Sequence, residues 1–488
     1  MADFLDRLFL LIQYDPFEPM IFNSGFFMFL FLGCIVFYQV VVNNKRARIL
    51  YLLIFSLYFY YKSSGIYFLL LIISSIIDYS AGKWIAETSS QAKKRLLLIL
   101  SIVTNFGLLG YFKYTNFFIN TFNDLNLGTF ETSDIFLPVG ISFFTFQSLS
   151  YTIDVYRGKL DWEKNFTDFL FFVSFFPQLV AGPIVRAKDF LPQIHKEIFV
   201  SKDDIARATF LIIAGLFKKA IIADYISINF VDRVFEMPLR YTGVENLLAL
   251  YGYALQIYCD FSGYSDMAIG IALLLGFKLP INFDSPYKAA TITEFWRRWH
   301  ISLSSWLKDY LYISLGGNKK GKLKQYRNLM LTMLLGGLWH GAAWKFVVWG
   351  GVHGLALAVE KILNIPELVK KNRMLRVVGM LITFHIVCLC WVFFRAGTFQ
   401  LGLDMINQIL FFFHANVFIQ FIDGYPSVLF LMIVGLLVHF TPKSLEIKTE
   451  LLIGKLPVLG KAFLVAAVIW LVIQVQSSEM QPFIYFQF

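Results

Sequence analysis

Two Trp-His dipeptides stand inside apolar stretches of this chain, and they are the residues best suited to chemistry. His300 follows Trp299, and His340 follows Trp339. A neutral imidazole accepts a proton from a hydroxyl group near neutral pH, and such base catalysis accelerates acyl transfer by about 10²–10⁴-fold. Membrane-embedded histidines are often functional, although a satisfied structural histidine is an equal alternative. We therefore take His300 and His340 as candidate catalytic residues.

The residues around His300 predict a helix with one chemically distinct face. Thr291 and Glu294 fit the T-x-x-E capping box, which predicts a helix that begins there and continues to about residue 314. Trp296, His300 and Ser304 are four residues apart, so a helix places them on one face. Trp296 and Ser304 are therefore candidate substrate-binding residues beside the imidazole.

Charged and hydroxyl side chains in apolar runs form a second set of candidates for binding substrate. Asp260, Ser262 and Asp266 lie within the apolar run of residues 247–277. Carboxylates are costly in hydrocarbon, so they line a hydrated path or pair with cations; pairing that merely holds helices together is an equal alternative. Arg297 can meet a phosphate or one of these carboxylates.

Glycines surround His340 and permit close approach of backbone or ligand. Gly337 precedes it and Gly341 follows it, and both also suit a break at membrane depth. Trp339 is adjacent, and Trp344 packs on the imidazole if the chain is helical between them. We add both tryptophans to the candidate substrate-binding residues.

Other kinds of site fit the sequence less well. No H-E-x-x-H, P-loop or G-x-S-x-G motif is present, and the thirteen-residue spacing of His340 and His353 places them on different helix faces. We predict no metal site and no tightly bound cofactor. The remaining histidines and the cysteines are predicted to be structural: His195, His385, His414, His439, Cys34, Cys259, Cys388 and Cys390.

Composition indicates an all-α polytopic membrane protein. The chain has 488 residues, of which 57% are hydrophobic, and its apolar runs are continuous rather than alternating. We predict roughly eleven to thirteen membrane segments, some of them short, tilted or re-entrant, because Pro and Gly interrupt several runs. The polar residues within 137–147 should face other protein or a water-filled cavity.

The charge pattern indicates orientation rather than nucleic-acid binding. The net charge is +10, but the basic residues cluster at the ends of apolar runs, as in cytoplasmic loops. The acidic residues 1–19 do not resemble a cleavable signal peptide, and they place the N-terminus outside and Lys45 in the cytoplasm. The cluster within 319–327 is the strongest cytoplasmic marker.

Several long motifs resemble the membrane-bound O-acyltransferase (MBOAT) family, in particular its alginate O-acetylation branch. They are Phe295-Trp296-Arg297-Arg298-Trp299-His300-Ile301-Ser302-Leu303-Ser304, Leu335-Gly336-Gly337-Leu338-Trp339-His340-Gly341-Ala342, Tyr258-Cys259-Asp260-Phe261-Ser262-Gly263-Tyr264-Ser265 and Val180-Ala181-Gly182-Pro183. Ser314 stands where the family pattern has Pro, which leaves only the local loop geometry in doubt.

The resemblance implies a fold and an activity. His340 would be the principal catalytic histidine and His300 the second one, in helices ringed around a central tunnel. Residues 1–488 would form a single domain, with a catalytic core at about 137–354 and peripheral helices at 20–113 and 377–475.

The implied activity is acetyl transfer in a bacterial inner membrane. An acetyl group would pass from a cytoplasmic thioester, with acetyl-CoA as the expected donor, across the membrane to an extracytoplasmic polysaccharide. The implied partners are the lipid bilayer, a periplasmic acetyltransferase and an acyl-CoA or acyl-carrier donor, with no nucleic acid. The phosphates of the donor would be attracted by residues 319–327.

Two alternatives remain open from the sequence. The first is transfer of a D-alanyl or longer acyl group from a carrier protein to teichoic acid, lipid or protein. The second is a transporter or flippase, because broken helices and buried charges also occur there. Release of free CoA by the purified protein would distinguish an acetyltransferase from a transporter.

Overall fold

The computed structural model describes residues 11–16, 19–319, 321–475 and 483, and every regular element within them is a helix. The predicted all-α fold is confirmed. The chain divides into two compact units, Met1–Asp204 with Ile271–Pro280, and Ile205–Gly270 with Ile281–Phe488. Every candidate site residue lies in the second unit. The single domain over residues 1–488 and the ring around a tunnel stay predictions.

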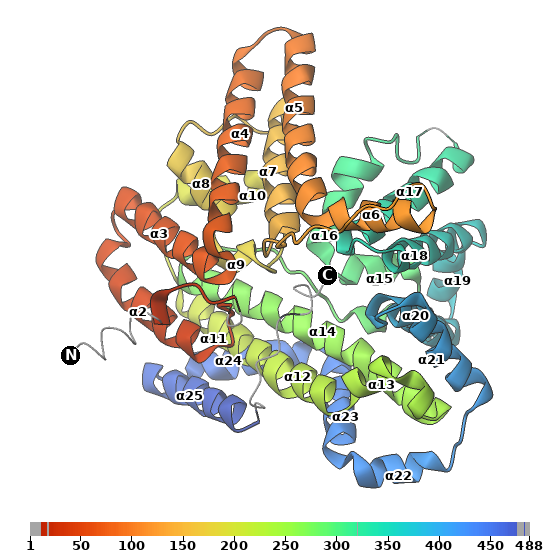
Figure 1. The fold of residues 1–488 in the computed structure, drawn as a ribbon. Helices are drawn as coiled ribbons and strands as arrows, with labels where there is room; N and C mark the ends of the chain where they lie inside the picture. The colour runs from red at the N-terminus through yellow and green to blue at the C-terminus, as the bar shows by residue number, and fades with distance from the viewer. Residues whose placement is uncertain (1–10, 17–18, 320, 476–482, 484–488) are drawn as a thin grey trace. The chain divides into compact units, whose positions relative to one another are not determined.

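The first unit is made of helices joined by short connections (Figure 1). They are α2 (Gly25–Val41), α3 (Lys45–Ser64), the 3₁₀ helix η1 (Gly65–Tyr67), α4 (Phe68–Glu87), α5 (Gln91–Leu109), the π-helix η2 (Gly110–Tyr114), α6 (Thr115–Asp124), α7 (Ile141–Tyr156), α8 (Phe166–Ser174), α9 (Phe176–Leu179) and α10 (Ala187–Ile194).

Helices α4, α5 and α7 pack side by side around buried polar groups. Asp78 is fully buried, and it accepts hydrogen bonds from Ser101, Asn105 and Thr152. Because burying an unpaired polar group is costly, each of these side chains specifies which helix faces the other. The polar residues within 137–147 are buried as well, so the prediction that they face other protein or a cavity is confirmed.

The second unit contains the longest helix and several short or broken ones. Its elements are α11 (Lys202–Leu216), the π-helix η3 (Phe217–Ala223), α12 (Asp224–Ile226), the π-helix η4 (Ser227–Val231), α13 (Asp232–Glu236), the 3₁₀ helix η5 (Pro238–Arg240), α14 (Gly243–Leu274), the 3₁₀ helix η6 (Pro286–Lys288), α15 (Ile292–Arg298), α16 (Ile301–Trp306), the π-helix η7 (Leu307–Tyr312), α17 (Lys322–His340), α18 (Trp344–Ile362), α19 (Ile365–Lys371), α20 (Arg373–Arg395), α21 (Phe399–Phe411), α22 (Val417–Gly424), α23 (Pro426–Phe440), α24 (Lys443–Lys455) and α25 (Val458–Val475).

Glycines let α17 and α18 pack closely. A methyl group at Gly337 would overlap the backbone oxygen of Phe346, and one at Gly350 would overlap that of Met333. The glycines before His340 were predicted to permit close approach of backbone or ligand. In the structure it is the backbone of α18 that approaches them. This approach fixes the direction in which the end of α17 presents His340.

The described residues include helices that are long and apolar enough to cross a membrane. By length and composition there are three such segments: Lys45–Glu87, Gln91–Asp124 and Arg373–Arg395. There are five if the bent pairs Trp344–Ile362 with Ile365–Lys371 and Val417–Gly424 with Pro426–Phe440 are each one span. The predicted eleven to thirteen segments also include short and broken helices, so that number stays a prediction.

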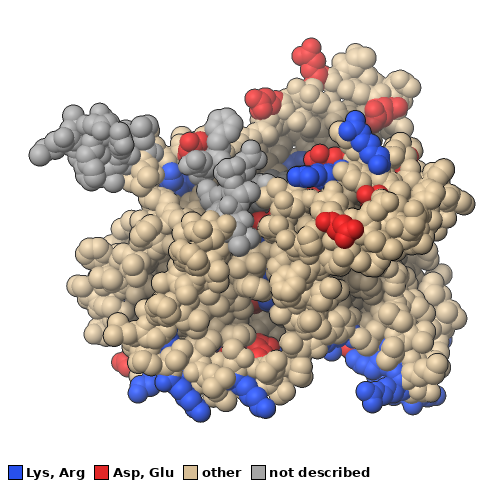
Figure 2. Space-filling view, turned by 90° about the horizontal axis from the view of Figure 1, so that it is seen from below, with Lys and Arg blue, Asp and Glu red and all other residues tan. Residues whose placement is uncertain are grey.

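The surface fits a lipid environment. Phe29, Val40 and Leu459 are 79%, 81% and 84% exposed, which would be unfavourable in water for so many large apolar side chains. Figure 2 shows a face covered mostly by uncharged side chains. We conclude that the exposed apolar surfaces of the helices contact lipid.

Candidate active site

The helix predicted to carry His300 begins where expected but is broken before the histidine. Thr291 caps α15, because its hydroxyl accepts a hydrogen bond from the Glu294 N–H at 3.0 Å. The helix ends at Arg298, and His300 has a left-handed backbone with φ 43° and ψ 55°. The prediction of one helix over residues 291–314 is therefore wrong, although its start is confirmed.

This break also removes the helix face predicted for Trp296, His300 and Ser304. A left-handed backbone at a non-glycine residue costs about 1–2 kcal/mol and persists only where surrounding contacts hold it. One such contact comes from Asn282, whose backbone carbonyl oxygen accepts a hydrogen bond from the Ile301 N–H at 2.9 Å. Local spacing misled the prediction because it contains no information about this distant partner.

The His300 imidazole is completely buried among aromatic rings. Its Nδ1 lies 3.1 Å from Asn282 Oδ1. The ring of Phe261 meets it edge-on at 4.7 Å between centroids, and the rings of Phe283 and Trp339 lie at 6.5 and 6.2 Å. This environment excludes bulk water and holds the imidazole in one orientation.

His340 is the last residue of α17 and is also buried among aromatic rings. Trp339, Trp349 and Phe394 surround its imidazole, with centroids 5.1, 5.0 and 5.5 Å away. The chain is not helical between His340 and Trp344, so the condition for packing Trp344 on the imidazole is not met. Trp344 is 57% exposed, whereas Trp349 on α18 lies against the imidazole.

Trp339 connects the two candidate catalytic histidines. Its ring lies 5.1 Å from His340 and 6.2 Å from His300, between centroids. The structure thus brings together two histidines that the sequence placed forty positions apart. We describe His300, Trp339, His340 and Trp349 as the histidine core.

A third histidine borders this core, and sequence analysis gave it no role. His353 on α18 is fully buried between Trp349 and Trp296, with centroids 4.8 and 5.2 Å away. Among the described residues, neither of its ring nitrogens has a hydrogen-bond partner. His353 and Trp349 are four residues apart on one helix, so this neighbour could have been found from spacing. Both His340 and His353 contact Trp349, although they lie on different helices.

The carboxylates of α14 form ion pairs with consecutive lysines. Lys219 contacts Asp260 at 2.6 Å and Asp224 at 2.7 Å, and Lys218 contacts Asp266 at 2.6 Å. The lysines belong to the π-helix η3, a kind of distortion that is frequent at functional sites. The alternative in which these carboxylates pair with basic side chains and hold helices together is therefore observed.

The arginines next to His300 have other partners. Arg298 contacts Glu294 at 3.0 Å and Asp284 at 3.4 Å, while Arg297 is exposed. Neither forms an observed ion pair with Asp260 or Asp266, so the suggested contact between Arg297 and these carboxylates is not observed. The lysines of η3 take those positions instead.

Ser304 and Ser262, two further residues predicted to bind substrate, lie in different surroundings. Ser304 is partly buried and donates a hydrogen bond to the Trp299 carbonyl oxygen at 3.2 Å. The Ser262 hydroxyl is buried and has no hydrogen-bond partner among the residues that the structure describes. Ser262 instead lines a pocket within the second unit.

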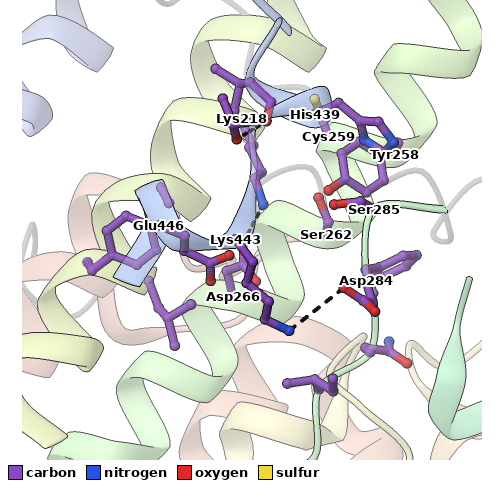
Figure 3. Close-up of a pocket in the computed structure, with 18 of the residues that line it drawn as sticks. Lys218, Tyr258, Cys259, Ser262, Asp266, Asp284, Ser285, His439, Lys443 and Glu446 are labelled. Carbon is purple, nitrogen blue, oxygen red and sulfur yellow. Dashed lines mark hydrogen bonds and ion pairs between the residues drawn. The ribbon is translucent and has the colours of Figure 1, made fainter. Parts of the chain in front are cut away.

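This pocket has a volume of about 550 Å³. Figure 3 shows charged side chains of both signs on its wall, among them Lys218, Lys443 and Asp266. Its charged residues are the cations Arg207, Lys218, Lys288, Arg298 and Lys443 and the carboxylates Asp266, Asp284 and Glu446. Burial, followed by the nearby Arg298 charge, lowers the pKa of Lys288, although Asp284 and Glu446 oppose this. Cations thus outnumber carboxylates, so the pocket favours an anionic ligand.

The pocket reaches the surroundings of His300. Asn282 and Phe283 line it, and both contact the His300 imidazole. His439 lines it as well, and its Nε2 accepts a hydrogen bond from the Tyr287 N–H at 3.1 Å. His439 was predicted to be structural, and this bond agrees with that role. Asn282 was missed altogether, because it lies within the loop between α14 and η6 and carries no sequence signal.

One group of residues in the first unit could hold a metal ion by distance. Ligand atoms of Glu163, Asp168 and His195 all lie within 4.8 Å of one another. However, Lys45 Nζ lies 2.8 Å from His195 Nδ1 and 3.4 Å from Asp168. A lysine ammonium therefore already balances these carboxylates. The prediction of no metal stays a prediction.

The fold and the site together define a class of protein. It is a helical membrane protein whose buried histidines are enclosed by tryptophan rings, away from bulk water and close to a basic pocket. Such imidazoles can accept a proton from a hydroxyl group during group transfer. Neither the fold nor the histidine core by itself specifies which group is transferred.

Comparison with known proteins supplies the family. Residues 164–399 match the model of the MBOAT, membrane-bound O-acyltransferase family. The chain is 41% identical to the peptidoglycan O-acetyltransferase of Helicobacter pylori, over 68% of each chain. It is 43% identical to the probable alginate O-acetylase AlgI of Pseudomonas aeruginosa, over 80% of this chain and 75% of that one.

A more distant relative is the teichoic acid D-alanyltransferase of Bacillus subtilis, which is 29% identical over 54% of this chain and 69% of that one. The chain belongs to the MBOAT family and is a membrane O-acyltransferase. The resemblance predicted from the motifs is confirmed, and the transporter alternative is set aside.

Proposed function

We propose that this enzyme moves an acetyl group from a cytoplasmic thioester, with acetyl-CoA as the expected donor, across the inner membrane of a bacterium for O-acetylation of an extracytoplasmic polysaccharide. The supporting observation is His340, a buried imidazole among aromatic rings in a chain that is similar over most of its length to two polysaccharide O-acetyltransferases by name. The bilayer and a periplasmic acetyltransferase are the proposed partners.

In the proposed reaction, the neutral His340 imidazole accepts the proton of the acceptor hydroxyl. The hydroxyl oxygen then forms a C–O bond with the acyl carbon, and the C–S bond of the thioester breaks. The leaving thiolate takes that proton from the His340 imidazolium, so the products are an ester and a free thiol and the imidazole is neutral again. His300, which shares Trp339 with His340, is the second proposed catalytic histidine.

The basic pocket supports an anionic donor. Coenzyme A and phosphopantetheine-bearing carrier proteins both carry phosphates, which lysine and arginine side chains attract. Lys288, Arg298 and Lys443 belong to the pocket lining, together with Asn282 beside His300. We propose that the donor phosphates bind here, with residues 319–327 increasing the local concentration of the donor.

The second candidate function is D-alanyl transfer from a carrier protein to teichoic acid. The Bacillus subtilis relative favours it, but that match is less identical and covers less of this chain than the acetyltransferase matches. A purified enzyme supplied with acetyl-CoA or with a D-alanyl carrier protein distinguishes the two. Thiol release with acetyl-CoA is expected, and release with the carrier alone would overturn the proposed donor.

A further inference from the structure

We propose that Asn282 is a positioning residue that sets the proton distribution of His300. Its side chain holds the imidazole with the proton on Nδ1, and it leaves Nε2 as the basic nitrogen that faces the reaction. This inference rests on the proposed function, because it assumes that His300 takes part in acyl transfer.

The hydrogen bonds around Asn282 determine the orientation of its amide. Its Oδ1 accepts from the Ser302 N–H at 3.2 Å and from the Ser302 hydroxyl at 2.8 Å. A backbone N–H can only donate, so the amide atom that faces Ser302 has to be the oxygen. On the other side, Asn282 Nδ2 donates to the Ser265 hydroxyl at 3.2 Å, which agrees with that orientation.

The amide orientation in turn decides the tautomer of His300. The same Oδ1 lies 3.1 Å from His300 Nδ1, and an amide oxygen can only accept. Nδ1 of His300 therefore carries the proton in the neutral ring. The lone pair is then on Nε2, so the ring accepts a proton or a hydrogen bond there.

Asn282 also holds the backbone that carries the histidine. Its backbone carbonyl oxygen accepts a hydrogen bond from the N–H of Ile301, the residue that follows the left-handed His300. Asn282 is 1% exposed, and its side chain is part of the pocket lining. One residue thereby sets the turn, the ring orientation and the tautomer, as is typical of groups that support a catalytic histidine.

The titratable groups near the contact positions of His300 have partners of their own. Phe261 and Ser265 on α14 are flanked by Asp260 and Asp266, which pair with Lys219 and Lys218. Asp284, next to Phe283, pairs with Arg298, and Trp339 is followed by His340. A carboxylate placed at position 282 would therefore add a new charge in hydrogen-bond contact with the imidazole.

The test compares two substitutions by their effect on thiol release from acetyl-CoA by the full-length enzyme. Asn282→Leu removes the acceptor, and kcat is expected to fall by about 10²-fold or more, as for loss of general-base catalysis. Asn282→Asp keeps an acceptor for both Nδ1 and Ser302. The carboxylate stabilises the protonated ring of His300. In a plot of kcat against pH, the acidic limb should therefore shift to higher pH by about one unit or more.

Asn246→Asp is the matched control. Asn246 is equally buried in the second unit, and its Nδ2 donates to the carbonyl oxygens of Pro238, Tyr241 and Thr242. This substitution should lower thermal stability but leave the acidic limb at its wild-type pH. A change in the limb for both variants would mean that a buried carboxylate acts through general destabilisation, and the inference would fail.

The outcomes separate this inference from the proposed function. If His300→Ala is inactive while Asn282→Asp has a wild-type pH profile, the positioning role of Asn282 is wrong and the role of His300 stands. Wild-type kcat in Asn282→Leu would overturn the inference in the same way. If His300→Ala is fully active, the proposed role of His300 and the inference both fail, whereas the role of His340 is unaffected.

Discussion

Buried polar groups are treated in opposite ways in two regions of this protein. Asp78 in the first unit accepts hydrogen bonds from Ser101, Asn105 and Thr152 on neighbouring helices. The histidine core of the second unit is enclosed mainly by aromatic rings, with Trp349 against His340. Side chains that satisfy a buried carboxylate hold neighbouring helices together, whereas aromatic rings around an imidazole exclude bulk water from it.

The ion pairs of α14 show the same contrast on a smaller scale. Lys219 is 3% exposed and contacts two carboxylates, whereas Lys218 is 17% exposed and lines the pocket. The first lysine is therefore expected to act in stability and the second in binding. Substitutions that separate activity from stability test both comparisons.

The largest expected effect is on activity, at His340. His340→Ala should lower thiol release from acetyl-CoA by about 10²–10⁴-fold, because the proton acceptor is lost. Expression and melting temperature in detergent should stay close to wild type. His414→Ala is the control, since His414 is exposed, and it should retain full activity. Retained acetylation in His340→Ala would refute the catalytic assignment.

The next largest effect is on stability, at Lys219. Lys219→Met leaves the buried Asp260 and the partly buried Asp224 without their shared cation, and loss of one partner of a buried ion pair costs about 3–5 kcal/mol. A large fall in melting temperature and in the yield of folded protein is expected. Unfolding in detergent, followed by size exclusion and fluorescence, measures it. A stable Lys219→Met protein would show that water or another group compensates these carboxylates.

A smaller effect on stability is expected at Asp78. Asp78→Leu removes the acceptor for Ser101, Asn105 and Thr152, and such buried unsatisfied groups cost about 1–3 kcal/mol. The melting temperature should fall, while activity per folded molecule stays within about twofold, as for changes away from a site. If activity fell without loss of stability, the polar cluster would have a role in the reaction, and the comparison between the two regions would fail.

The smallest effect is expected at Lys218. Lys218→Met removes one cation from the pocket, which should raise KM for acetyl-CoA by about 3–10-fold and leave kcat unchanged, as for lost ground-state binding. Stability should change by less than about 1 kcal/mol, because the pair with Asp266 is partly exposed. An unchanged KM would exclude the pocket as the site of the donor phosphates.

Much of the site could be predicted from sequence where the signal is local. Thr291 was identified as a helix cap from a four-residue pattern, and the structure confirms it. His300 and His340 were identified from their Trp-His dipeptides, and both lie in one aromatic core. The helix through His300 was predicted wrongly, because a capping signal reports where a helix starts and spacing does not report where it breaks.

Partners that are distant in the chain could not be predicted. Asp260 and Asp266 were recognised as buried charges, but their lysines lie 41 and 48 residues earlier on another helix, and no pattern connects the two segments. The same holds for Asn282 and His300, whose hydrogen bond joins residues 18 apart across a loop. Side-chain pairing of this kind depends on how helices cross, which sequence periodicity does not contain.

The sequence by itself determined the membrane-embedded helical class, the family and the two histidines, because apolar length, charge placement and long motifs are local properties of the chain. Only the tertiary structure decided which rings enclose each imidazole, which cation neutralises each carboxylate and where the basic pocket lies. Those features depend on the close packing of glycine-lined helices and on a left-handed turn at His300 that a distant asparagine stabilises.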